Sequence, residues 1–166
     1  INTITSLFSE QPFQLIELGS GDGGKTQLLI ESIVSKKIDL QYYPIDISEG
    51  AIRDLVTTLK SKYLNTTLKV KGLVGDYFVG LKNLTKKPNH RNMVLFLGVT
   101  LNNMTPLNIN IFLRKFHKSL NNQEFVLIGF DLIKFLKIIY HVYNDSKGLF
   151  KKFNLHLLYL IIQVLG

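Results

Sequence analysis

Four glycines lie between a strand-like apolar run and a helix-like run, and this stretch constrains the fold more than any other part of the sequence. Phe13–Leu18 is followed by Gly19-Ser20-Gly21-Asp22-Gly23-Gly24, and a helical pattern starts at Lys25. Glycine adopts positive φ angles without strain and lets a ligand approach the backbone closely. Two glycines would be enough for a plain tight turn. The sequence therefore predicts a strand–loop–helix unit that binds a ligand between Gly19 and Gly24.

Short apolar runs alternate with longer helical patterns along the rest of the chain. The expected strands are Phe13–Leu18, Gln41–Ile47, Leu68–Val74, Met93–Leu97 and Phe125–Phe130. The expected helices are Lys25–Ser35, a helix capped by Ser48 that reaches Tyr63, Pro106–Leu120, Ile133–Tyr143 and Phe153–Leu165, with a polar loop from Lys82 to Asn92. This alternation predicts an α/β fold with a doubly wound, mostly parallel sheet and helices on both faces. Met93–Leu97 is apolar throughout and is expected in the centre of the sheet.

Length and composition are those of one globular domain, expected to span residues 1–166. The chain has 166 residues, of which 46% are hydrophobic and 19% charged, so disorder is not favoured. It contains no cysteine, which excludes disulfides, thiolate metal sites and a cysteine nucleophile. The first residue is Ile1, and we expect the chain to be part of a longer protein.

The basic charge and the apolar C-terminal run each raise the question of a partner. The net charge is +8, but the lysines are scattered in pairs and no nucleic-acid-binding motif accompanies them, so nucleic acid is not an expected partner. No apolar run reaches the ~18 residues of a membrane span, and a cytoplasmic location is expected. The final apolar helix, Phe153–Leu165, needs a covering surface, from a further C-terminal domain or from self-association.

The glycine loop also fits a phosphate-binding loop. Gly19 to Thr26 satisfies G-x-x-x-x-G-K-[ST], follows a strand and opens a helix. In that interpretation Lys25 would reach the phosphates of a nucleotide, Thr26 would hold Mg²⁺, and Asp131 could serve as the aspartate on the metal side.

Three carboxylates favour a sulfonium nucleoside over a nucleotide polyphosphate. Glu17 stands beside the loop, where it would repel phosphates and tolerate a cation. Asp46 ends the second strand, where an acidic side chain can bind both hydroxyls of a ribose. Asp76 follows the third strand and can accept a hydrogen bond from an adenine amino group, with Tyr77 against the base. Each of these carboxylates is a weak signal alone. Their recurrence at successive strand ends is less easily explained by chance.

The sequence resembles the histidine-specific S-adenosylmethionine-dependent methyltransferases of ergothioneine biosynthesis, a group that includes relatives acting on other aromatic amino acids. The matching blocks are Glu17-Leu-Gly-Ser-Gly-x-x-x-Lys25-Thr26, Tyr43-Pro-Ile-Asp46-Ile-Ser48, Gly75-Asp76-Tyr77, Leu95-Phe-Leu-Gly98-x-Thr100-x-x-Asn103, Asp131-Leu-Ile-Lys134, Tyr143-Asn-Asp145, Phe153-Asn154-Leu-x-Leu-Leu and Leu165-Gly166. They cover nearly the whole chain in order. The resemblance implies a Rossmann-like class I methyltransferase that N-methylates the α-amine of histidine or a related amino acid.

The resemblance also implies which residues bind cofactor and substrate. The implied S-adenosylmethionine site comprises Glu17, Gly19, Ser20, Gly21, Lys25, Asp46, Ile47, Asp76, Tyr77 and Gly98. Gly98 and Asn103 would receive the amino acid, and Tyr143 would help Asn103 to bind its carboxylate. No residue is singled out as a catalytic acid or base, and no metal is expected.

Simpler roles stay open for two of these residues, and two other functions stay open for the chain. Asn103 could cap the turn before Pro106, and Tyr143 could be a core tyrosine. The loop filling Asp22-Gly23-Gly24 and Val99 depart from the family pattern, and the family's flanking segments, which read the imidazole, are missing here. The alternatives to an amino-acid methyltransferase are a phosphate-binding-loop protein and a catalytically incomplete cofactor-binding module.

Overall fold

The computed structural model describes residues 4, 13–85, 91–98, 101, 103–122, 124–130 and 135–165. The chain divides into two compact units, Ile1–Phe130 and Asp131–Gly166. The first is an α/β unit and the second consists of helices, and each is described by itself.

The first unit is built on a parallel sheet with the strand order β3-β2-β1-β5-β6, in which β4 also pairs with β2. The strands are β1 (Phe13–Leu18), β2 (Leu40–Asp46), β3 (Leu68–Val70), β4 (Leu73–Val74), β5 (Arg91–Phe96) and β6 (Phe125–Ile128). In the register, Leu18 lies beside Ile45 and Glu17 beside Leu95, so the carboxyl ends of the inner strands meet at one edge. The direction in which successive strands are added to the sheet reverses after β1. Doubly wound sheets bind ligands at this point.

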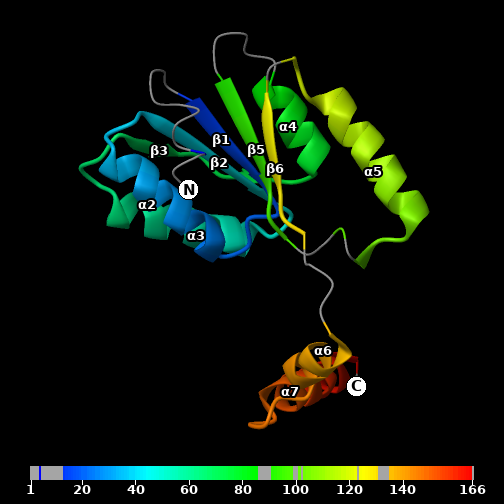
Figure 1. The fold of residues 1–166 in the computed structure, drawn as a ribbon. Coiled ribbons are helices and arrows are strands. Elements are labelled where there is room, and N and C mark those ends of the chain that lie inside the picture. Colours follow the sequence, from blue (N-terminus) through cyan, green and yellow to red (C-terminus); the bar gives the residue numbers. More distant parts are fainter. Residues whose placement is uncertain are drawn as a thin grey trace. The chain divides into compact units, whose positions relative to one another are not determined.

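Helices cover both faces of this sheet, as the sequence predicts (Figure 1). They are α2 (Gly24–Ser35), α3 (Glu49–Lys62), α4 (Tyr77–Thr85) and α5 (Pro106–Ser119). The α2 and α3 face buries Leu15, Leu29, Ile30, Ile33, Leu55, Leu59 and Leu95, among others. The α4 and α5 face buries Ile16, Ile45, Leu81, Leu84, Val94, Phe96, Phe112 and Phe116, among others. Alternate residues of each strand enter opposite cores because successive side chains of a strand point to opposite faces.

Two details of the first unit differ from the sequence-based expectation. The expected strand Leu68–Val74 is divided into β3 and β4 at Gly72, where a Cβ would lie 2.3 Å from the Ile52 side chain of α3. Met93 and its neighbours lie in β5, which pairs with β1 on one side and with β6 on the other, so this apolar run is an inner strand as predicted. In α2, Leu28 is 61% exposed and Ile30 is buried. The buried positions of α2 are therefore Thr26, Leu29, Ile30 and Ile33.

The second difference is helix α4, which was not predicted from the sequence. The expected loop from Lys82 to Asn92 is helical as far as Thr85, and β5 already begins at Arg91. The helix begins after Asp76, whose Oδ1 accepts hydrogen bonds from the backbone N–H groups of Phe78 at 2.9 Å and Val79 at 3.1 Å. This is an N-cap arrangement. A ligand role was assigned to Asp76 in the sequence, and its capping role was overlooked.

The second unit is a pair of helices, α6 (Leu136–Tyr143) and α7 (Leu149–Leu165). The expected helix Phe153–Leu165 begins earlier, because the carboxylate of Asp145 accepts from the N–H groups of Leu149 and Phe150, both at 2.9 Å. Tyr143 packs edge-to-face on Phe150, with ring centroids 5.1 Å apart. In the described part of the chain, we find no helix with the length and apolarity that crossing a membrane requires.

Candidate functional site

The glycine loop forms a tight cradle after β1. Gly19, Gly21 and Gly23 have φ angles of 73°, 52° and 69°, a region that side chains disfavour. The N–H of Gly19 donates to the Ile45 carbonyl at 2.8 Å, and the N–H of Gly23 donates to the Ser20 carbonyl at 2.8 Å. The loop therefore depends on its glycines and is attached to the end of β2.

Asp46 ties the end of β2 to this loop. Its Oδ2 accepts from the N–H of Gly21 at 3.1 Å, and its Oδ1 accepts from the N–H of Ser48 at 3.0 Å. The backbone carbonyl of Asp46 accepts from the N–H of Gly75 at 2.9 Å. Asp46 thus connects the loop after β1 with the end of β4, two segments that were predicted separately from the sequence.

Glu17 lies almost wholly inside the protein, with 4% of its surface exposed. Its Oε1 accepts from the Thr26 hydroxyl at 2.6 Å, and its Oε2 accepts from the Tyr42 hydroxyl. Burial raises the pKa of Glu17, although the two hydroxyls and the charge of Lys25 oppose that effect. The carboxylate is thus held from both sides by neutral donors.

A cavity of about 160 Å³ lies over the loop and reaches Glu17. It is lined by Glu17, Gly19, Ser20, Asp22, Gly24, Lys25, Leu97 and Gly98. Pockets for drug-sized ligands are roughly 300–1,000 Å³, so this one fits the amino-acid part of a nucleoside cofactor rather than the whole molecule. The Ser20 hydroxyl is buried and has no hydrogen-bond partner among the described residues, and Ser20 lines this cavity.

Lys25 crosses this cavity to the neighbouring strand. Its Nζ donates to the carbonyl of Leu97 at 3.4 Å, which brings the start of α2 to the end of β5. Asp22 accepts from the N–H of Gly24 at 2.9 Å and stabilises the loop from within. Asp22 and Gly24 belong to the predicted ligand-binding loop but, like Leu97, were not among the individual site residues predicted from the sequence.

Tyr77 and Asp76 lie next to the cavity, beyond its lining. A Cβ placed on Gly19 would lie 2.9 Å from the Tyr77 hydroxyl, so loop and ring are in close contact. Tyr77 also packs edge-to-face on Phe96, with ring centroids 6.4 Å apart. Burial raises the pKa of Tyr77, and the charges of Asp46 and Asp76 add to that effect. Asp46 at the end of β2, and Asp76 and Tyr77 after β4, are therefore neighbours in space.

The structure does not gather all the selected residues at this cavity. Ile47 is 76% exposed and does not line it. Asn103 is exposed, and the N-cap of α5 is Thr105, whose hydroxyl accepts from the N–H of Asn108 at 3.3 Å. Tyr143 belongs to the second unit, which leaves its side chain exposed, so it is not a core tyrosine of that unit. Val99, Thr100 and Asp131 lie outside the described residues.

The geometry does not favour a phosphate-binding loop. The hydroxyl that would hold Mg²⁺, on Thr26, is fully buried and donates to Glu17. A nucleotide would also bring its phosphates against the Glu17 carboxyl group.

The parallel sheet with its reversal after β1, the glycine cradle and the acidic residues at successive strand ends define an α/β protein of the Rossmann-like, class I methyltransferase type. A family model described as histidine-specific methyltransferase, SAM-dependent, matches residues 1–166. The chain therefore belongs to the family of histidine-specific, S-adenosylmethionine-dependent methyltransferases.

Curated relatives agree with this family. The chain is 29% identical over 163 residues to ergothioneine biosynthesis protein 1 of Schizosaccharomyces pombe, covering 96% of this chain and 21% of the relative. It is 28% identical over 153 residues to histidine N-alpha-methyltransferase of Mycolicibacterium smegmatis, covering 92% and 46%. It is 28% identical over 130 residues to 4-dimethylallyltryptophan N-methyltransferase of Claviceps purpurea, covering 72% and 37%. The chain thus spans less than half the length of each of these relatives.

Proposed function

We propose that this chain binds S-adenosylmethionine at the glycine loop and serves the N-methylation of the α-amine of histidine or a related amino acid. The observation that carries the proposal is the hydrogen bond between the carboxylate of Asp46 and the N–H of Gly21. It joins the ribose-binding candidate to the glycine loop, of which Gly19, Ser20, Asp22 and Gly24 line the cavity. The names of the relatives support the choice of acceptor, since they describe methyltransferases that act on the nitrogen of histidine or of a tryptophan derivative.

The residues present fit such a cofactor. Gly19, Ser20, Lys25 and Gly98 line the cavity and would surround its methionine part, together with Gly21 of the same loop. Glu17 would face the ammonium group. When bound, the cofactor supplies an electrophilic methyl group on a sulfonium centre.

Beyond the cavity, the nucleoside part would reach the neighbouring strand ends. Asp46 would accept from the ribose hydroxyls, and Asp76 from the adenine amino group. The Oδ2 of Asp76 has no partner among the described residues, so its capping role leaves one oxygen for this bond. Tyr77 and Ile47 would lie against the base; the exposed side chain of Ile47 is then explained by the ligand that covers it.

The residues proposed for the substrate act by positioning. Asn103 and Tyr143 would hold the amino-acid carboxylate through an amide and a phenol, and Gly98 would leave room beside the cofactor. These groups leave the α-amine free, so the chain would contribute orientation rather than a strong base. We include both compact units in one methyltransferase domain, and a cytoplasmic location belongs to the same proposal.

Calorimetry with S-adenosylhomocysteine and, separately, with Mg²⁺-ATP tests the cofactor. We expect the homocysteine compound to bind and the nucleotide not to bind; the reverse result would refute the proposal in favour of a phosphate-binding loop. The acceptor is tested by screening amino acids for methyl transfer by the full-length protein. Cofactor binding without transfer to any amino acid would favour an incomplete cofactor-binding module.

A further inference from the structure

A buried hydroxyl–carboxylate–hydroxyl network lies beneath the cofactor cavity. Tyr42 and Thr26 are fully buried, and Glu17 is 4% exposed. The two hydroxyls donate to different oxygens of the same carboxyl group, Thr26 to Oε1 and Tyr42 to Oε2. The three residues come from three elements, β2, β1 and α2, so the network joins both sides of the glycine loop.

This arrangement restricts Glu17 to one orientation. A carboxyl group held by a donor on each oxygen cannot rotate without breaking a buried hydrogen bond, and a buried polar group left unpaired is costly. Glu17 also lines the cavity over the loop. The network therefore keeps the Glu17 carboxyl group in one orientation beside the cavity.

The same donors affect the charge of Glu17. Both are neutral, and hydrogen bonds to a carboxylate favour its ionised form. The charged groups that act on Glu17 from its surroundings are Lys25, which favours ionisation, and Asp22, which opposes it. Burial opposes it more strongly than either.

We propose that Tyr42 and Thr26 are positioning residues for the cofactor, holding Glu17 in place and ionised so that it can receive the ammonium group of the methionine part. This inference rests on the proposed function. Neither residue touches the cofactor in this arrangement, and both act through Glu17.

A specific pH dependence follows from this role. Burial raises the pKa of Glu17 in the ligand-free protein, and an ammonium group binds the ionised form better. Affinity should therefore be constant above that pKa and fall by about tenfold for each pH unit below it. The ammonium group of the ligand stays charged below its own pKa of about 8, so the effect is measurable on the acidic side.

The test is the affinity for S-adenosylhomocysteine as a function of pH, measured by calorimetry on the purified protein and its variants. Tyr42→Phe and Thr26→Val each remove one hydroxyl and should move the midpoint of the affinity loss to higher pH. Thr26→Ser keeps a hydroxyl and should restore the original midpoint. Glu17→Gln should abolish the pH-dependent step.

The outcomes separate this inference from the function on which it rests. A purely structural network would lower the melting temperature of Tyr42→Phe and Thr26→Val without moving the midpoint, and that result would overturn the inference. A pH-dependent step that survives in Glu17→Gln would overturn it as well, with cofactor binding intact. Absence of binding by the unmodified protein at every pH would instead refute the proposed function. If Tyr42→Phe does not fold, the Thr26→Val and Thr26→Ser pair decides.

Discussion

The Oδ2 atom of Asp46 accepts a hydrogen bond from the backbone N–H of Gly21 at 3.1 Å, so an acidic strand end and a glycine loop that are far apart in the sequence form one site. The second oxygen of Asp46 accepts from the N–H of Ser48, which begins the turn into α3. The carboxylate therefore shapes the loop before any ligand binds. It combines a structural role with its proposed role toward the ribose.

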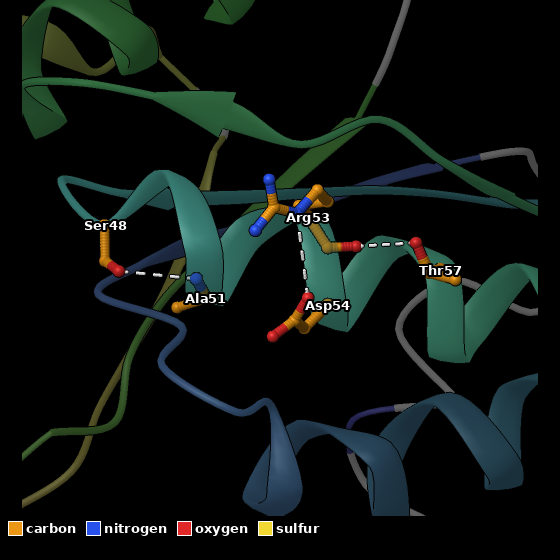
Figure 2. A network of polar contacts seen from close by, with 5 residues as sticks. All are labelled: Ser48, Ala51, Arg53, Asp54 and Thr57. Carbon is orange, nitrogen blue, oxygen red and sulfur yellow. Dashed lines mark hydrogen bonds and ion pairs between the residues drawn. The ribbon is translucent and has the colours of Figure 1, made fainter.

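Replacing Asp46 by Ala should weaken binding of S-adenosylhomocysteine by about 1–3 kcal/mol, the cost of losing hydrogen bonds to a charged group. Calorimetry measures this change. The matched control is Asp54→Ala, because Asp54 is 80% exposed and lies 3.8 Å from Arg53 on the outer side of α3 (Figure 2). Exposed ion pairs contribute little, so affinity should not change in the control. Unchanged affinity in Asp46→Ala would remove this residue from the proposed site.

Replacing Gly19 by Ala should destabilise the protein by about 1–2 kcal/mol, because its φ of 73° is unfavourable for a residue with a side chain. The new Cβ would also lie 2.9 Å from the Tyr77 hydroxyl and displace that ring. Cofactor affinity should fall together with stability. Chemical denaturation and calorimetry measure the two effects.

Gly50→Ala provides the control for this substitution. Gly50 lies in α3 with open space around its Cα, so alanine should stabilise the helix by up to about 1 kcal/mol. Equal losses of stability at Gly19 and Gly50 would contradict the explanation given for Gly19.

Replacing Ser48 by Ala should lower the free energy of unfolding by about 0.5–2 kcal/mol, because the Ser48 hydroxyl caps α3. It accepts from the N–H of Ala51 at 3.3 Å (Figure 2). Thr57→Ala is a suitable comparison in the same helix, since the Thr57 hydroxyl only donates back to the Arg53 carbonyl at 2.8 Å. Alanine has the higher helix propensity, so this variant should lose no stability. Denaturation curves distinguish the two, and equal losses would argue against the cap.

The turn between α6 and α7 should open in acid. The N–H groups of Phe150 and Leu149 lower the pKa of Asp145, so the bonds to its ionised form are present above the ordinary pKa of an aspartate. They are lost as the pH falls through the lowered value in the folded protein. Hydrogen exchange of the Leu149 and Phe150 amides, corrected for the intrinsic effect of pH, should show this loss of protection.

Asp145→Ala should show the same loss of protection already at neutral pH. Amides in the middle of α7, such as that of Leu158, serve as the internal reference. Full protection of Leu149 and Phe150 in this variant would show that the carboxylate does not hold the turn.

Local sequence patterns predicted most of the α/β unit. The alternation of apolar runs and helical patterns predicted the parallel sheet and most of its strands, because strands buried on both faces, such as β1 and β5, are rich in apolar residues. The predictions failed where tertiary contacts outweighed local pattern. Gly72, which separates β3 from β4, packs closely against Ile52 of α3, and helix α4 begins where Asp76 caps it.

The sequence by itself determined the fold class, the glycine loop and the acidic residues at the strand ends, since these depend on residue type and on spacing along the chain. Only the tertiary structure decided how they are used. The buried hydroxyl of Thr26 bonds to Glu17 and is not free for a metal, Asp76 caps α4, and Asp46 holds the loop. The physical reason is that the role of each carboxylate depends on which atoms lie beside it at the edge of the sheet. The order of β1, β2 and β5 in the sheet determines those neighbours.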